Sequence, residues 1–264
     1  LAFCCCLNII NAQITIDNTT YSTTQLVDGV LVPSGSGTVI SNVVFRGVYN
    51  NSGRYQVGYF STATTTLAQM GFTNGVVLTS GNTSGIPLTL GVDPRSVAQM
   101  ATGYTSCTPG EIRQGGSCPA GINDLDILAG AQNYFNASVL EFDFVPQGDT
   151  IRFNYTFASV EYPGFICTAF NDAFGFFLSG PGISGTFTNG AVNLAVVPGT
   201  NIPVTINSIN DAPGGGACNP ACPCNAQYFV NNYTAPVDTN VLFGGLTISM
   251  EAVAQVICGD TYHI

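Results

Sequence analysis

The sequence has little charge, no lysine and no tryptophan, and its one histidine is His263. Only 8% of the 264 residues are charged, and 15 acidic residues against 5 basic ones give a formal net charge of −10. A nucleic-acid groove needs clustered Lys and Arg to neutralise phosphates, so that function is excluded. An acidic surface also disfavours anionic membranes. Catalysis by a histidine base or a lysine nucleophile has almost no residues available.

Long apolar runs are also missing. The mean hydropathy is +0.31, yet no internal segment approaches the roughly 18 to 20 uncharged apolar residues of a membrane-spanning helix. The apolar residues lie in short runs that 31 glycines and 14 prolines interrupt. We therefore expect no membrane span and a single domain with a sizeable core.

The first 12 residues, LAFCCCLNIINA, are almost continuously apolar. They are typical of the end of a secretory signal peptide, with the small Ala12 before a mature start at Gln13. A lipoprotein signal ending at Cys4 and a buried N-terminal strand are two alternatives. The signal-peptide interpretation predicts export, and it removes Cys4, Cys5 and Cys6 from the mature chain.

The mature region keeps seven of the ten cysteines, which we expect to form disulfides in an exported protein. They are Cys107, Cys118, Cys167, Cys218, Cys222, Cys224 and Cys258. Cys107 and Cys118 are the preferred local pair because both lie in a Gly/Pro/Ser-rich segment, while the other pairings stay open. A thiolate metal site at residues 218–224 is disfavoured, since paired C-x2-4-C spacing and a neighbouring histidine are missing. The odd cysteine would pair beyond residue 264.

The clearest strand pattern is a two-residue alternation in Val139–Val145 and again in residues 151–157. A Gln-Gly-Asp turn separates the two segments, so we expect them to form an antiparallel hairpin with one solvated face. Arg152 would then lie across from Glu141 or Asp143.

Further strand patterns are short and separated by turn residues. They occupy residues 38–49, 55–60, 75–79, 173–178, 192–197, 204–209, 227–231 and 246–253. Short helices are expected at residues 23–30, 93–100 and 122–133. We predict an all-β fold for residues 13–264: a jelly-roll-like antiparallel sandwich of two sheets in one domain, with a few short helices and disulfide-pinned loops.

Seven sequence blocks occur in an order that carries a family resemblance. They are residues 21–44, 75–81 (GVVLTSG), 139–146 (VLEFDFVP), 157–162 (FASVEY), 171–182 (NDAFGFFLSGPG), 193–204 and 262–264 (YHI). Together they resemble the choice-of-anchor L domain of secreted and cell-surface proteins of Bacteroidetes-type bacteria. The resemblance covers nearly the whole mature region.

The resemblance implies a secreted or cell-surface location and no assigned enzymatic activity. Members usually stand at the N-terminus of large exported proteins, before repeat or adhesive modules and often a type IX secretion sorting domain. In members of the family a further apolar strand and an Asp-rich turn follow the Tyr-His-Ile segment. We therefore expect this domain to be truncated at its C-terminus.

The densest polar grouping predicts a calcium site. Its candidate ligands are Glu161, Asn171 and Asp172, with Asp124 and Asp126 earlier in the chain. Their oxygen atoms suit a hard cation, and extracellular calcium is plentiful enough for modest affinity. The alternative is that these side chains only cap helices and turns.

Two catalytic interpretations are weaker. Glu161 and Asp172 match the paired carboxylates of a glycoside hydrolase, but a tryptophan platform for the sugar is missing. A Ser/His/Asp triad would depend on His263, and no G-x-S-x-G segment accompanies it. We therefore expect no enzymatic activity.

Exposed polar and aromatic residues near the end of the chain are candidates for glycan contact, or else an ordinary strand face. They are Tyr228, Asn231, Asn232 and Tyr233. We expect a non-catalytic structural or adhesive module at the cell surface, whose partners are downstream modules of the same polypeptide, surface glycans or proteins. A secreted carbohydrate-active domain is one alternative. A self-assembling filament subunit that accepts a neighbour's strand is another.

Overall fold

A computed structural model describes most of the chain outside its first residues and its long central segment. The described residues are 14–47, 49–51, 54–62, 71, 73–81, 83, 123–128, 130, 137–168, 171–212, 218–220, 222–234 and 243–264. The predicted helix at residues 93–100 and the preferred pair Cys107 and Cys118 lie outside them.

The first layer is an antiparallel sheet built from segments far apart in the sequence. In spatial order its strands are β11 (Val192–Asn193), β10 (Phe177–Leu178), β15 (Tyr262–His263), β7 (Val139–Val145) and β2 (Val39–Arg46). An isolated bridge between Ser179 and His263 joins β10 to β15. The strand β15 therefore has hydrogen-bonded neighbours on both sides.

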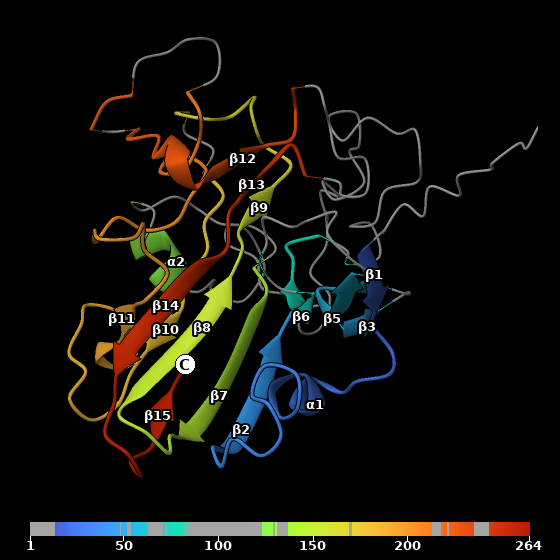
Figure 1. The fold of residues 1–264 in the computed structure, drawn as a ribbon, viewed down its shortest axis with the longest axis vertical. Coiled ribbons are helices and arrows are strands. Elements are labelled where there is room, and N and C mark those ends of the chain that lie inside the picture. The colour runs from blue at the N-terminus through green and yellow to red at the C-terminus, as the bar shows by residue number, and fades with distance from the viewer. Residues whose placement is uncertain are drawn as a thin grey trace, which may run out of the picture.

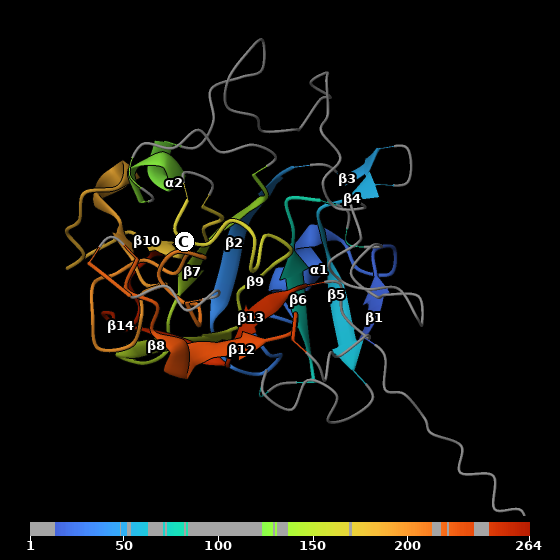
Figure 2. The ribbon, with the colours of Figure 1, turned by 90° about the horizontal axis from the view of Figure 1, so that it is seen from above.

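The second layer faces the first (Figures 1 and 2). Its strands are β8 (Thr150–Tyr155), β9 (Ala158–Ser159), β12 (Phe229–Asn231), β13 (Gly245–Thr247) and β14 (Met250–Gln255). Pairing joins β14 to β8, and β13 to both β9 and β12. The backbone N–H of Thr247 also donates to the carbonyl of Phe157 at 2.8 Å. This bond lies between the β14–β8 pair and the three strands β12, β13 and β9, and it joins them into one layer.

A third sheet with order β1–β5–β6 lies at one end of the sandwich (Figure 2). Its strands are β1 (Ile14–Asp17), β5 (Val57–Thr62) and β6 (Asn74–Leu78), and α1 (Thr23–Val27) packs against β5. The small hairpin of β3 (Tyr49–Asn51) and β4 (Arg54–Tyr55) and the helix α2 (Asn123–Leu128) complete the larger elements. No helix in the described part of the chain is long and apolar enough to cross a membrane.

The core lies between the two layers, and alternation along each strand explains it. Phe142 and Phe144 of β7 are 2% and 3% exposed and pack with Tyr262 and Leu178 from the same layer. Ile151 of β8 and other side chains of the second layer close this cluster from the opposite side. The all-β antiparallel prediction is confirmed, because the strands pair antiparallel and place inward residues at every second position in two buried clusters.

The predicted hairpin of residues 139–157 is wrong. The strands β7 and β8 belong to different layers, because the turn between them carries the chain from one sheet to the other. Arg152 consequently pairs with Glu251 of β14 at 2.7 Å, while Glu141 pairs with Arg46 of β2. The alternation predicted both strands correctly, but it could not distinguish a hairpin from an arch whose two apolar faces meet.

Several predicted elements are shorter than expected. Strand structure within 173–178 is limited to β10, and within 192–197 to β11. Residues 204–209 form no strand; the hydroxyls of Thr205 and Ser208 bind backbone groups of each other and of Pro203 in a compact turn. The two helices are also shorter, at Thr23–Val27 and Asn123–Leu128.

Two disulfides hold the segment that follows the core. Cys167 is bonded to Cys222, and Cys218 to Cys224. Each bond joins an exposed cysteine to one that is 2% exposed. Cys258 is free and exposed, so among the described cysteines it is the odd one.

Candidate functional site

A group of buried and half-buried polar side chains gathers around β9 at the end of the second layer. The hydroxyl of Ser159 donates a hydrogen bond to Asp172 Oδ2 at 2.6 Å. The hydroxyl oxygen of Ser159 also accepts the backbone N–H of Glu161 at 3.0 Å. We call Ser159, Glu161 and Asp172 the acidic cluster. One hydroxyl therefore holds two carboxyl-bearing residues together from separate segments.

Burial dominates the electrostatics of the acidic cluster. Burial, together with the nearby charge of Asp172, raises the pKa of Glu161 to about 7. Burial also raises the pKa of Asp172, although the hydrogen bond from Ser159 acts in the opposite direction. The Oε2 atom of Glu161 is enclosed and has no hydrogen-bond partner among the described residues. Binding of a proton or a cation at Glu161 would remove the repulsion between the two carboxylates.

The chain beside the acidic cluster is fixed from several directions. Tyr162 is 2% exposed, and its hydroxyl donates to the carbonyl of Ile209 at 2.6 Å. The backbone N–H of Cys167 donates to Asn207 Oδ1 at 2.6 Å. Because Cys167 is also tied to Cys222, the turn after the cluster is held by both a covalent bond and side-chain hydrogen bonds.

The five expected calcium ligands do not form one centre. Asn171 Oδ1 accepts the backbone N–H of Asn207 at 3.2 Å. On α2, Asp124 Oδ1 accepts the N–H and the hydroxyl of Thr188 at 2.9 and 3.0 Å, and Asp126 lies on the same helix. Within the described part of the chain, no three His, Cys, Asp or Glu side chains gather so that they could hold a metal ion. The structure brings Glu161 and Asp172 together, and calcium binding stays a prediction.

The geometry of the acidic cluster favours a structural role over glycoside hydrolysis. A glycosidase presents both carboxyl groups to the sugar. Here Asp172 is half-buried and its Oδ2 atom accepts the hydroxyl of Ser159, and one oxygen of Glu161 is buried. One oxygen of each carboxyl group is thus hydrogen-bonded or buried, which differs from the open pair of a glycosidase.

His263 lies in a row of polar side chains on the outer face of the first layer. Its Nδ1 atom is 2.7 Å from Asp143 Oδ1, and Asn42 donates to the other oxygen of Asp143 at 2.6 Å. The Nε2 atom faces Glu141 Oε1 at 3.8 Å, and Arg46 binds the same carboxylate. A carboxylate thus stands where a Ser/His/Asp triad would need a serine hydroxyl.

Three of the four residues proposed for glycan contact near the end of the chain, Asn231, Asn232 and Tyr233, use their side chains in internal hydrogen bonds. Asn232 is 3% exposed and donates to the carbonyl of Phe243 at 2.9 Å. Asn231 Oδ1 accepts the backbone N–H groups of Tyr233 and Thr234, and its Nδ2 atom donates to Asp211. The hydroxyl of Tyr233 is also bound to Asp211. These contacts support the alternative of an ordinary, internally bonded strand end.

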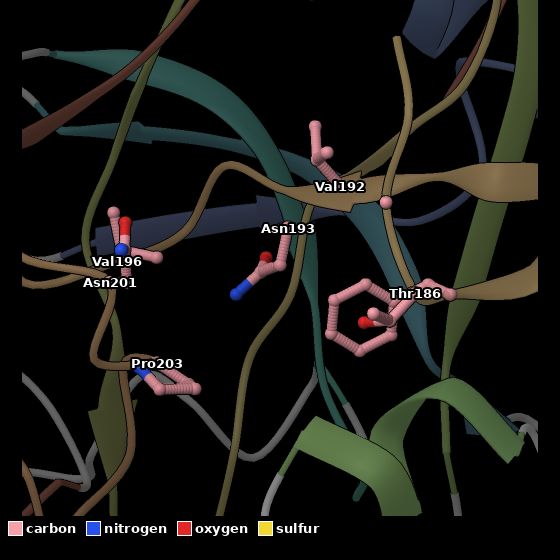
Figure 3. Close-up of a pocket in the computed structure, with 8 residues that line it drawn as sticks. Thr186, Val192, Asn193, Val196, Asn201 and Pro203 are labelled. Atoms are coloured by element: carbon pink, nitrogen blue, oxygen red, sulfur yellow. The ribbon is translucent and has the colours of Figure 1, made fainter.

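A shallow cavity of about 220 Å³ lies beside β11 (Figure 3). Its walls are Gly185, Thr186, Phe187, Val192, Asn193, Val196, Asn201 and Pro203. Asn193 Oδ1 accepts the N–H groups of Phe176 and Ala195, and its Nδ2 atom donates to the Ala195 carbonyl. The amide in the middle of this cavity therefore serves the backbone and has little capacity left for a ligand.

A second hollow, of about 340 Å³, lies between α1 and the third sheet. Tyr21, Gln25, Asp28, Gly29, Val30, Tyr59 and Asn74 line it, and we call it the tyrosine hollow. The sequence analysis missed it because its residues come from three separate elements. Only Ser22 and Gln25, which form a capping box at the start of α1, carry a local sequence signal.

Comparison with known proteins gives one match. A family model described as "Choice-of-anchor L domain" matches residues 15–264. Neither the curated proteins nor the solved structures contain a match. The match extends over nearly the same residues as the seven blocks of the sequence analysis.

Proposed function

The chain belongs to the choice-of-anchor L domain family, and from this premise we propose that it is a non-catalytic structural and adhesive module of a larger exported bacterial protein. Membership of the family and the presence of disulfides indicate an extracellular or cell-surface protein. The adhesive role, the larger polypeptide and the absence of catalysis go beyond that statement.

The two disulfides are the observation that carries the proposal. The bond between Cys167 and Cys222 fastens the later segment to the turn at Cys167, beside a core that includes Cys222 and Tyr162, and the bond between Cys218 and Cys224 closes that segment on itself. A disulfide-held loop on a two-layer sandwich keeps its surface rigid outside the cell, where no chaperone repairs it. Rigidity of this kind suits a module that bears contacts rather than one that closes around a substrate.

Labelling and attachment test the proposal. An antibody raised against the oxidised domain should label intact cells, and protease added outside should remove the label. Beads coated with the oxidised chain should attach to the surface that the cells colonise, whereas beads coated with reduced and alkylated chain should attach much less. Label that appears only after lysis, or equal attachment of both bead types, would contradict the proposal.

Calcium stabilisation is a second part of the proposal, and it now rests on Glu161 and Asp172. The carboxylates of Glu161 and Asp172 lie close together, and one buried oxygen of Glu161 has no hydrogen bond among the described residues. A divalent cation bound between them at alkaline pH would therefore stabilise the folded state. The melting temperature should then rise with millimolar CaCl2 at pH 8 and fall back with EGTA. The variant Glu161→Gln should lose this rise, and Glu251→Gln, which alters an exposed ion pair, should keep it. An unchanged melting temperature in CaCl2 would reject calcium.

A further inference from the structure

We propose that the tyrosine hollow binds a neutral sugar ring of a surface glycan. This inference rests on the proposed function and names the ligand class through which the module would adhere. The hollow has a volume of about 340 Å³, which lies within the roughly 300–1,000 Å³ of small-molecule sites. It is placed between α1 and the strands β5 and β6, which lie beside one another in Figure 2.

Two aromatic rings form one wall of the hollow. The ring centroids of Tyr21 and Tyr59 are 5.1 Å apart, and the ring planes are tilted by 41°. Tilted rings present a concave apolar surface, and the electron-rich face of each ring attracts the C–H groups of a sugar. Both side chains are half-buried, so each ring is anchored and still partly exposed.

Hydrogen-bonding groups surround the rings, and most of their donors and acceptors are not used by other described residues. Gln25, Asp28 and Asn74 are exposed at the hollow. The Asp28 carboxylate and the Tyr59 hydroxyl have no hydrogen-bond partner in the part of the chain that the structure describes. Gln25 uses only its Oε1 atom, which accepts the N–H of Ser22 at 2.9 Å, and Asn74 has only a long contact of 3.5 Å with Thr73. The free carboxylate and amides match the alternating donors and acceptors of sugar hydroxyl groups.

The charge of the hollow selects among sugars. Among the described residues, Asp28 is the only charged side chain that lines it, and the whole chain carries a net charge of −10. A sialic or uronic acid would meet like charge there and would lack a cation to pair with. A neutral hexose or N-acetylhexosamine has no charge that Asp28 would repel and needs no cation in the hollow.

The surrounding backbone holds the hollow in shape before any ligand arrives. Asp17 Oδ1 accepts the N–H groups of Thr19 and Thr20, both at 2.9 Å. These bonds fix the turn directly before Tyr21. The capping box of Ser22 and Gln25 then fixes the start of α1. On the opposite wall, Tyr59 is paired with both Asp17 and Val76 in the middle of the third sheet. A site built on such elements binds without first ordering a loop.

A proline-rich peptide is the other ligand that tyrosine pairs accept. Such a peptide contacts aromatic ridges with its apolar rings and has few hydrogen-bond donors. It would leave the carboxylate of Asp28 and the two amides without partners. The balance of groups in the hollow therefore favours the sugar.

A glycan array tests the inference. The folded oxidised chain would be applied to immobilised glucose, mannose and N-acetylglucosamine oligomers and to sialylated oligosaccharides, and the strongest response would be titrated with the free oligosaccharide. We expect binding to neutral oligomers alone. Tyr59→Ala and Asp28→Asn should each weaken it by about tenfold or more, and Tyr59→Phe should retain most of it because the ring remains.

Matched controls separate binding from folding. Phe165→Ala removes another exposed aromatic ring, away from the hollow, and should bind like the unaltered chain. Asp28→Asn changes an exposed side chain with no hydrogen-bond partner among the described residues, so the melting temperature of this variant should not change. The inference is overturned if no neutral glycan binds, if Tyr59→Ala and Asp28→Asn bind normally, or if a polyproline peptide binds in place of the sugar. Coated beads that still attach when they carry Tyr59→Ala would overturn the sugar site alone and leave the adhesive module intact.

Discussion

The Nδ1 atom of His263 lies 2.7 Å from Asp143 Oδ1, and the two residues are directly paired across β15 and β7. The contact lies on the solvated face of the first layer, opposite the stacked rings of Tyr262 and Phe144. The pairing of β15 with β7 is thus supported by a polar contact on one face and an aromatic contact on the other.

Replacement of Asp143 by asparagine should destabilise the fold at neutral pH. Hydrogen bonds from Asn42 and then from His263 lower the pKa of Asp143, so its ionised form stabilises the folded state. That stabilisation is present above the ordinary pKa of about 4 and is lost as the pH falls through the lowered value. We expect Asp143→Asn to cost less than about 1 kcal/mol in urea unfolding at pH 7, because the site is partly exposed, and nothing once the pH is below the lowered pKa of Asp143. The side chain of Asp28 has no hydrogen-bond partner among the described residues, so Asp28→Asn should leave the free energy of unfolding unchanged at both pH values.

Glu161 should give the opposite pH dependence. Its pKa in the folded chain is raised to about 7 from 4.5, so the protonated form is favoured by folding. The stabilisation is complete below about pH 4.5 and is lost as the pH rises through 7. Glu161→Gln keeps the neutral form at every pH, and without added calcium it should raise the free energy of unfolding at pH 8.5 by about 1–2 kcal/mol after solvent screening. A gain of equal size at pH 5 would show that the charge is not the cause.

The two disulfides should differ in their contribution to stability. Cys167 and Cys222 are 55 residues apart, whereas Cys218 and Cys224 are 6 apart. Loop-closure entropy predicts losses of about 4 kcal/mol and about 2 kcal/mol when each bond is removed. The double variants Cys167→Ala/Cys222→Ala and Cys218→Ala/Cys224→Ala are well matched, since each replaces one exposed and one buried cysteine. Urea unfolding of both should give this order, and the reverse order would point to native-state contacts as the main term.

Two buried tyrosine hydroxyls provide a paired test of hydrogen bonding in the core. The hydroxyl of Tyr262 accepts the N–H of Ile257 and donates to the carbonyl of Pro181, both at 2.8 Å. The hydroxyl of Tyr155 is buried without a partner among the described residues. Tyr262→Phe should therefore cost about 1–3 kcal/mol, and Tyr155→Phe should be neutral or stabilising. Thermal unfolding of both variants decides, and a loss from Tyr155→Phe would reveal a partner for that hydroxyl.

Local pattern was sufficient to predict the strands but not their partners. The alternation in β7 and β8 reflects burial of one face, which any pairing partner would satisfy. Partner choice depends on contacts such as Arg46 with Glu141 and Arg152 with Glu251, which join residues 95 and 99 apart. The strand prediction for residues 204–209 was wrong for another reason. The apolar side chains of this segment are buried as in a strand, but the hydroxyls of Thr205 and Ser208 accept each other's backbone N–H groups, which a strand would pair with a neighbouring strand.

The acidic cluster was predictable in part. Glu161 and Asp172 stand in conspicuous polar positions of an apolar sequence, and the fold does bring them together through Ser159. The sequence cannot reveal that Asp124 is used by Thr188. It also offers no signal for the tyrosine hollow, because Tyr21, Tyr59 and Asn74 become neighbours only when α1 packs against β5.

The arch between β7 and β8 has a consequence for the time course of folding. Each strand of the arch pairs with strands that are distant in the sequence. β7 pairs with β2 and with β15, and β8 pairs with β14; β14 and β15 both lie near residue 264. Such high contact order makes folding slow, on the order of milliseconds to seconds. The first 150 residues cannot close a sandwich by themselves. The two layers of the sandwich can therefore be completed only when the segment that carries β14 and β15 is available to pair with β8 and β7.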